Sequence, residues 1–310
     1  MKILITGGAG YIGSVLSGML LDRGYNVTII DKFIFNQNSL GHIAHNKKLN
    51  IIKGDANKAS DIKKLIKEND VIVPLAGYVG APICKKYPRL STEANKGSIQ
   101  LLKKYLSPGQ FVIYPNSNSG YGTTNPDKFC DESTPLNPIS LYGKDKKIAE
   151  DILMERENST VFRLATVFGT SPRMRVDLLV NDFTLKAAKF NKITIFEKTF
   201  VRNYIHVRDV SRAFMYAMEN KKKFQNEIFN HGLSNANLTK LELCHKIKRV
   251  IKSFKIVCND YKKDIDKRNY RVSNKKLERT GFKNVYSLED GIRELVQFYK
   301  IYKVENSSNI

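Results

Sequence analysis

The chain has 310 residues, of which 42% are hydrophobic and 26% charged, and its formal net charge is +22. No apolar run approaches the roughly 20 residues that cross a bilayer, and the start, MKILITGGAG, is typical of a strand and not of a signal peptide. Four scattered cysteines without a C-x-x-C pair argue against a metal or disulfide framework and favour a reducing, cytoplasmic location. We therefore expect a globular protein with no membrane partner and no metal.

Apolar strands alternate with helical patterns through the first half of the chain. The predicted strands cover 2–6, 25–31, 49–55, 70–77, 110–117 and 160–169, and the predicted helices cover 11–23 and about 59–69, 91–106 and 142–157. Continuous apolar strands between helices indicate a parallel sheet that is covered on both faces. The fold class that we expect is α/β, with a doubly wound sheet of the Rossmann type.

The pattern changes after Gly169. Helices at about 177–190, 208–220, 239–253 and 288–302 mix there with short strands at 193–197, 227–232 and 254–258. We predict a cofactor-binding domain over 1–170 and a smaller substrate-binding lobe over 171–310. A segment at about 200–232 is expected to return to the first domain.

A glycine-rich turn separates the first predicted strand from the first predicted helix. Gly7, Gly10 and Gly13 have the spacing G-x-x-G-x-x-G. Glycine allows a tight turn, a close approach of backbone to a pyrophosphate, and close packing of helix on strand. The amide groups at the helix start then bind the phosphates. This placement predicts a dinucleotide site.

Acidic residues follow the second and third predicted strands. Asp31 has the position that binds the ribose of a dinucleotide, and its carboxylate favours NAD over NADP because it repels a 2′-phosphate. Lys32 partly offsets that repulsion. Asp55 is placed either to contact the adenine or to cap a turn, and the sequence leaves both open.

A tyrosine and a lysine, Tyr142 and Lys146, stand four residues apart in S-L-Y-G-K-D-K and so share one helix face. A phenol has a pKa of about 10, and a nearby ammonium lowers it. Bringing it to neutrality requires about 4 kcal/mol of preferential stabilisation, to which a positive nicotinamide ring must also contribute. Tyr142 is then a base for a substrate hydroxyl, which Ser117 at a strand end is placed to align.

Taken together, these motifs and the later segment R-N-Y-I-H-V-R-D-V (202–210) resemble the extended short-chain dehydrogenase/reductase family, in its nucleotide-sugar epimerase and dehydratase branch. The resemblance covers essentially the whole chain. It implies a tightly bound NAD/NADH, a homodimer formed through the helices at about 91–106 and 142–157, and a catalytic triad of Ser117, Tyr142 and Lys146. It adds cofactor contacts from Tyr11, Ile12, Lys32, Ala56, Leu75, Ala76, Gly77 and Asn95. It places substrate contacts at Val79, Ser117, Asn118, Ser119, Thr166, Arg173, Asn181, Arg202 and Arg268, the last two arginines clamping the diphosphate.

Departures from the family pattern narrow the reaction. Asn203 replaces an Asp, Thr166 replaces an Asn found in several epimerases, and Asn118-Ser119 replaces the Asp-Glu pair of 4,6-dehydratases. Eliminating water requires an acid and a base that Asn118-Ser119 lacks, so dehydration is disfavoured. Redox chemistry at one carbinol, most simply C4, is left.

Three segments, 79–88, 114–122 and 162–175, resemble the GDP-heptose 4-dehydrogenases of bacterial capsule synthesis. The favoured hypothesis is oxidation of a GDP-manno-heptose at C4, and the alternative is a nucleotide-sugar 4-epimerase. A non-catalytic NAD sensor or nucleic-acid binder is the rival from another class, because the chain is strongly basic. Its lysines are dispersed and not gathered in a stripe, so we expect no nucleic-acid partner.

Overall fold

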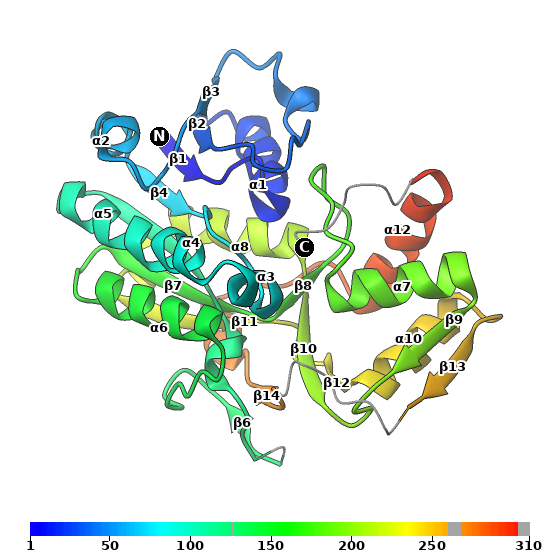
Figure 1. Ribbon diagram of the computed structural model, residues 1–310. Coiled ribbons are helices and arrows are strands. Elements are labelled where there is room, and N and C mark those ends of the chain that lie inside the picture. Colours follow the sequence, from blue (N-terminus) through cyan, green and yellow to red (C-terminus); the bar gives the residue numbers. More distant parts are fainter. Residues whose placement is uncertain (126, 260–267, 303–310) are drawn as a thin grey trace.

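The computed structural model describes residues 1–125, 127–259 and 268–302 (Figure 1). Its centre is a seven-stranded parallel sheet in the order β11-β7-β5-β4-β1-β2-β3. The strands are β1 (Lys2–Thr6), β2 (Asn26–Asp31), β3 (Leu49–Lys53), β4 (Val71–Pro74), β5 (Phe111–Ser117), β7 (Ser159–Leu164) and β11 (Glu227–His231). The strand order reverses between β1 and β4, and ligands of such sheets bind at the carboxyl edge beside that reversal.

Helices cover both faces of the sheet because its central strands β1, β4, β5 and β7 are buried on both sides. Ile3 and Ile5 of β1 pack in the core that contains α1 (Tyr11–Asp22) and α8 (Val207–Glu219). Leu4 between them packs in the opposite core, with α2 (Ala59–Lys67), α5 (Ser98–Tyr105) and α6 (Leu141–Met154). This confirms the expected Rossmann-type fold.

A second group of elements lies beside the carboxyl edge of the sheet (Figure 1). It consists of a three-stranded sheet in the order β12-β10-β8, a parallel pair β13-β9, and helices that pack on one another. Their bounds are β8 (Thr166–Phe168), β9 (Lys192–Ile195), β10 (Val201–His206), β12 (Asn237–Thr239), β13 (Lys255–Cys258), α7 (Leu179–Phe190), α10 (Lys240–Val250) and α12 (Leu288–Ile301).

Short elements complete the described chain. They are η1 (Gly41–Ile43), α3 (Ala81–Lys86), α4 (Pro88–Thr92), η2 (Glu93–Gly97), η3 (Asn118–Tyr121), β6 (Phe129–Cys130), α9 (Lys221–Phe224), β14 (Arg271–Val272) and α11 (Lys275–Arg279). The helix predicted over 91–106 is in fact α4, a π-helical turn η2 and α5 in succession, and α3 before it was not predicted.

The strand predicted over 160–169 is wrong in one respect, because it is two strands in two sheets. β7 pairs with β5 and β11, whereas β8 pairs with β10. Ala165 between them donates its amide to His231 O, at the end of β11. The apolar sequence runs on unbroken through this point, so only the change of neighbouring strand separates the two.

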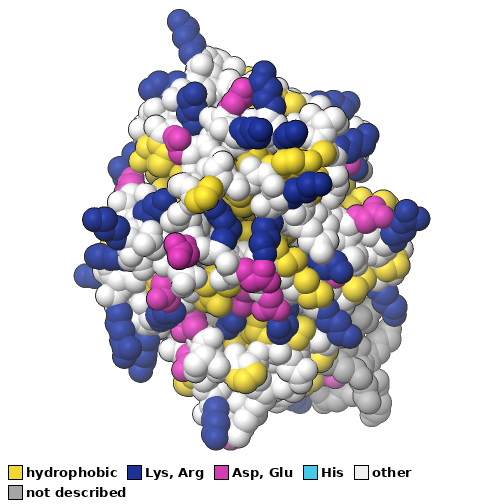
Figure 2. All heavy atoms as spheres, turned by 90° about the vertical axis from the view of Figure 1, so that its left-hand side faces the viewer, with side chains coloured by type: hydrophobic (Ala, Val, Ile, Leu, Met, Phe, Trp, Pro, Cys, Tyr) yellow, Lys and Arg dark blue, Asp and Glu magenta, His cyan; other side chains and the backbone are white. Residues whose placement is uncertain are grey.

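Lys and Arg side chains are spread over the face shown in Figure 2, with fewer Asp and Glu side chains among them. Within the described residues, no helix is both long enough and apolar enough to cross a membrane. No group of three or more His, Cys, Asp or Glu side chains in the described part is arranged to hold a metal ion.

Candidate active site

A cavity of about 370 Å³ lies at the carboxyl edge of the sheet; we call it the central cavity. It reaches from the turn after β1 to the start of α6. Most predicted site residues line it: Gly7, Gly10, Tyr11, Ile12, Gly13, Asp31, Lys32, Asp55, Ala56, Leu75, Ala76, Gly77, Val79, Ser117, Tyr142, Lys146, Thr166, Arg173 and Arg268. Segments far apart in the sequence therefore form one space.

The turn after β1 requires glycine at two positions. Gly7 has φ +69°, and a Cβ there would lie 2.6 Å from Ala76 N. A Cβ on Gly13 would lie 2.6 Å from the Cα of Gly8, so α1 packs directly on the turn. Gly10 precedes α1 and offers no side-chain cap. The first amides of α1 are thus open to an anionic group, and this cradle fits the pyrophosphate of a dinucleotide.

Asp31 ends β2 and lines the cavity beside that turn. Its carboxylate accepts hydrogen bonds from the amides of Ala9 (3.0 Å) and Phe33 (2.8 Å). Burial raises the pKa of this carboxyl, and these amides oppose the effect. Lys32 beside it forms an ion pair with Asp55, its Nζ 3.1 Å from Asp55 Oδ2. Because the Lys32 ammonium is paired with Asp55, it does not offset the repulsion between Asp31 and a 2′-phosphate.

Asp55 makes a turn contact and also lines the central cavity, and its contact with the adenine stays a prediction. Its Oδ1 accepts a hydrogen bond from the Asn57 amide at 2.9 Å, which is a turn contact, and the residue also lines the cavity. Partial burial favours a higher pKa for this carboxyl, but the Asn57 amide and Lys32 outweigh it and the pKa is lowered.

Ser117, Tyr142 and Lys146 face the cavity from two neighbouring elements. Ser117 ends β5, and its Oγ accepts a hydrogen bond from the Ser119 amide at 3.2 Å. Tyr142 and Lys146 lie one turn apart on α6, whose first turn is capped by Ser140. The Nζ of Lys146 lies 4.0 Å from the centroid of the Tyr114 ring on β5.

Burial dominates the ionisation of this pair. It raises the pKa of Tyr142 to about 12, against the guanidinium groups of Arg175 and Arg268. It lowers the pKa of Lys146 to about 7, against the carboxylate of Glu150. The protein alone therefore does not hold Tyr142 as a phenolate at neutral pH. The positive charge of the nicotinamide ring is needed to lower the pKa of Tyr142 further.

Three arginines, Arg173, Arg175 and Arg268, line the central cavity. The guanidinium of Arg173 lies 4.7 Å from the Phe35 ring centroid and near Asp31, so it belongs to the cofactor side. Arg175, which sequence reasoning missed, lines the cavity and pairs with Asp177. The spacing in S-P-R-M-R, which puts Arg173 and Arg175 two residues apart, was the available signal.

Five predicted site residues do not line the central cavity: Asn95, Asn118, Ser119, Asn181 and Arg202. Arg202 is buried in β10 and donates hydrogen bonds to the carbonyls of Val201 and Arg268. It therefore supports the segment that carries Arg268. Asn95 likewise supports a residue of the cavity wall, because its Nδ2 donates a hydrogen bond of 2.9 Å to the carbonyl of Tyr78, which lines the cavity.

Asn118 and Ser119 are buried in η3, directly after Ser117. Neither side chain has a hydrogen-bond partner in the structure. Both stand where a dehydratase would carry carboxylates, and neither supplies one.

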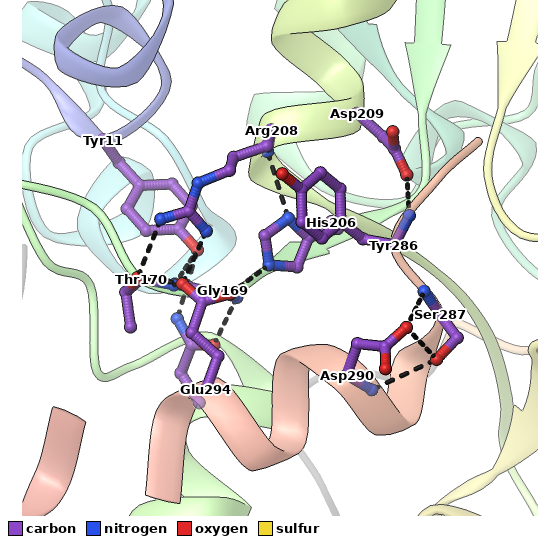
Figure 3. A network of polar contacts seen from close by, with 11 residues as sticks. Tyr11, Gly169, Thr170, His206, Arg208, Asp209, Tyr286, Ser287, Asp290 and Glu294 are labelled. Atoms are coloured by element: carbon purple, nitrogen blue, oxygen red, sulfur yellow. Dashed lines mark hydrogen bonds and ion pairs between the residues drawn. The ribbon is translucent and has the colours of Figure 1, made fainter. Parts of the chain in front are cut away.

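The residues behind the glycine turn form a buried polar network (Figure 3). The Tyr11 hydroxyl donates to Gly169 O at 2.7 Å, and Asn181 of α7 joins them, its Oδ1 3.0 Å from Gly169 N and its Nδ2 3.3 Å from the Tyr11 hydroxyl. The Ser171 hydroxyl donates to Tyr11 O at 2.7 Å. Tyr11 and Asn181 were both predicted to bind ligands. In the structure their polar groups form hydrogen bonds with other residues of the protein.

Glu294 of α12 anchors the same segment from the other side (Figure 3). Its carboxylate accepts hydrogen bonds from Thr170 N (3.1 Å) and Arg208 Nη1 (2.6 Å), and its Oε2 lies 2.8 Å from His206 Nε2. Burial opposes ionisation, but these partners lower the pKa of Glu294 to about 2. His206 and Arg208, from the I-H-V-R-D-V part of the sequence, thus hold α12 through Glu294. Glu294 also contacts Thr170, which follows the Gly169 that binds Tyr11.

A model of the NAD dependent epimerase/dehydratase family matches residues 3–232. The chain belongs to this family. Its cofactor is therefore NAD, for which the glycine turn and Asp31 form a fitting cradle.

Relatives in the NAD dependent epimerase/dehydratase family include several sugar-nucleotide enzymes. The UDP-glucose 4-epimerase of Lactobacillus helveticus is 28% identical over 81% of this chain and 82% of its own. The UDP-glucuronate 4-epimerase 3 of Arabidopsis thaliana is 26% identical over 97% of this chain and 77% of its own.

Solved structures of the family have the same fold. A UDP-glucose 4-epimerase with UDP-glucose from Thermotoga maritima superposes with a TM-score of 0.83 and 25% identity, covering 97% of this chain and 99% of that one. A UDP-glucuronic acid 4-epimerase from Bacillus cereus, in complex with UDP-glucuronic acid and NAD, gives a TM-score of 0.84 at 24% identity, with the same coverage.

Proposed function

We propose that this protein uses NAD to oxidise the C4 hydroxyl of a nucleotide-diphosphate sugar to a 4-ketone. The observation that carries the proposal is the central cavity, which joins the glycine turn to Ser117, Tyr142 and Lys146 in one space. A redox enzyme needs both halves together, whereas a cofactor sensor needs only the first.

In the proposed reaction, Tyr142 removes the proton of the sugar hydroxyl and Ser117 aligns that oxygen. NAD, which the glycine turn and Asp31 would hold, would supply the hydride acceptor and a positive ring at the site. Moving the Tyr142 pKa from about 12 to neutrality requires about 7 kcal/mol of preferential stabilisation of the phenolate. The Lys146 ammonium contributes to this only while it is protonated.

Chemistry at a single carbon is supported by where the carboxylates lie. Among the described residues, those that line the cavity are Asp31, Asp55 and Glu93. Asp31 ends β2 and Asp55 follows β3, and both take part in the contacts described above. Glu93 pairs with Arg89 at 2.9 Å. None of the three is on β5 or α6, which carry the reactive residues.

The cationic wall supports an anionic substrate. Arg175 and Arg268 line the cavity and both act electrostatically on Tyr142. A guanidinium suits the oxygens of a diphosphate. We propose that Arg268 contacts the diphosphate, with Arg202 holding its backbone.

The fate of the ketone separates two forms of the proposal. Release gives the net oxidation of a GDP-manno-heptose in capsular polysaccharide biosynthesis, which the resemblance of 79–88, 114–122 and 162–175 supports. Re-reduction from the other face gives a 4-epimerase, which the named epimerases among the relatives support. In either form we propose that the enzyme is a homodimer.

The test is incubation of purified protein with GDP-manno-heptose, UDP-glucose and UDP-glucuronic acid in separate reactions. NMR at C4 and NADH absorbance are followed together. A 4-ketone with stoichiometric NADH supports the dehydrogenase, and a C4 epimer without net NADH supports the epimerase. Salt-dependent binding of DNA or RNA without turnover of any sugar would replace both by the non-catalytic alternative.

A further inference from the structure

A buried ion pair lies behind the reactive residues. Arg163 of β7 and Glu150 of α6 approach to 2.6 Å between Nη2 and Oε1, and their side chains are only 6% and 4% exposed. A second contact joins Arg163 Nε to Glu150 Oε2 at 3.2 Å. Removing two charges from water costs several kcal/mol per ion, so such a pair is weak support for stability alone. The further contacts of Glu150 indicate a second role for this ion pair.

Glu150 connects to Ser117 through one intermediate residue. The Nδ2 of Asn116 donates a hydrogen bond to Glu150 Oε2. The Oδ1 of the same Asn116 accepts the Ser117 amide at 2.7 Å. Asn116 is itself 3% exposed, so water does not compete for these bonds.

Glu150 also lies one helical turn after Lys146, on the same face of α6. The groups around Lys146 come from several elements. Tyr114 on β5 and Tyr142 on α6 are phenols whose pKa values are raised by burial. Arg163 on β7 is paired with Glu150, and Asp145 on α6 accepts a hydrogen bond from Thr92 of α4 at 2.9 Å.

We propose that Glu150 is a positioning residue that serves both halves of the catalytic pair, holding Ser117 through Asn116 and keeping Lys146 protonated. Arg163 is the counter-ion that fixes the Glu150 carboxylate. The role in catalysis rests on the proposed function, whereas the effect on Lys146 does not.

The electrostatic part has a definite sign. Burial lowers the pKa of Lys146 to about 7, and Glu150 opposes that fall. Without the carboxylate the pKa drops further, so Lys146 loses its proton at a lower pH. If the pKa of Lys146 falls by about one unit, the fraction of Lys146 that is protonated becomes about tenfold smaller at any pH well above that pKa.

The experiment uses Glu150→Gln and the double variant Glu150→Gln/Arg163→Gln. The second removes both charges and leaves no unpaired guanidinium, so it remains folded if the single variant does not. Asn116→Ala cuts the connection to Ser117 but keeps the carboxylate. The pH dependence of NAD affinity and the pH profile of sugar oxidation are measured for each.

We expect the alkaline limb of both profiles to move by about one pH unit to lower pH in both Glu150 variants. Asn116→Ala should slow sugar oxidation without moving either limb. A wild-type profile in the double variant would reduce Glu150 to a partner of Arg163 and overturn the proposal. Because NAD binding needs no sugar, a shifted NAD profile without turnover of any sugar would refute the proposed function and leave this inference standing.

Discussion

One added methyl group at Gly7 is predicted to cost far more than the same group at Gly24 or Gly109. A Cβ on Gly7 would lie 2.6 Å from Ala76 N, 2.7 Å from Ala76 Cα and 2.9 Å from Leu75 C. All three are backbone atoms of the segment after β4, and backbone in a packed sheet cannot swing aside as a side chain does. The φ of +69° adds strain for any L-residue.

The magnitude follows from two separable costs. The left-handed conformation costs an L-residue about 1–2 kcal/mol, and overpacking costs about 1–3 kcal/mol. Gly7→Ala should therefore lower the free energy of unfolding by about 2–5 kcal/mol.

Two other glycines provide matched controls. Gly24 has φ +79°, and the nearest atom to its Cβ is the flexible Lys48 Nζ at 3.4 Å, so Gly24→Ala should show only the first cost. Gly109 has no neighbour within 4 Å, so Gly109→Ala should change the free energy by less than about 0.5 kcal/mol.

Urea unfolding of the three variants, with and without NADH, measures these costs. NADH affinity should fall in Gly7→Ala alone, because Leu75 and Ala76 line the cavity. Equal destabilisation in Gly7→Ala and Gly24→Ala would refute the close packing of the turn against β4.

Three further substitutions test other parts of the site. Tyr142→Phe should reduce sugar oxidation by about 10²–10⁴-fold, as expected for loss of a general base, and should leave NADH affinity in fluorescence titration unchanged; near-normal turnover would remove Tyr142 from that role. Asp31→Ser should improve NADP affinity relative to NAD by about tenfold or more in competition titrations, because the repulsion of a 2′-phosphate is lost; an unchanged ratio would contradict the assignment of Asp31. Glu294→Gln should lower the free energy of unfolding by on the order of 2 kcal/mol above about pH 5. Because the folded pKa of Glu294, about 2, lies below its ordinary value of 4.5, this difference should shrink as the pH falls from 4.5 towards 2, and a pH-independent difference would contradict it.

The sequence alone predicted the sheet, and it predicted that the glycine turn, Ser117, Tyr142 and Lys146 would lie at one site, for physical reasons. Strands that are apolar on both faces have few alternatives to a covered parallel sheet. The glycine turn, Ser117 and Tyr142 all follow strand ends or open helices, and the carboxyl edge of a parallel sheet brings such positions together.

What the sequence missed depends on contacts between distant segments. The strand breaks at Ala165 because the chain changes sheets there. β7 before it pairs with β5 and β11, whereas β8 after it pairs with β10. That Arg202 clamps the diphosphate stays a prediction, and the sequence could not show that its guanidinium donates a hydrogen bond to the carbonyl of Arg268. The raised pKa of Tyr142 follows from burial, which the spacing of Tyr142 and Lys146 does not reveal.

The most direct test of the account is a sugar nucleotide that carries deuterium at C4, mixed with protein and NAD. The measurement is the position of the label in sugar and cofactor by mass spectrometry and NMR. The account predicts that deuterium leaves C4 for the cofactor and either stays there, with a 4-ketone released, or returns to C4 in the epimer. Deuterium delivered to C6 with loss of water, or label that never leaves C4 of GDP-manno-heptose, UDP-glucose or UDP-glucuronic acid, would contradict oxidation confined to C4.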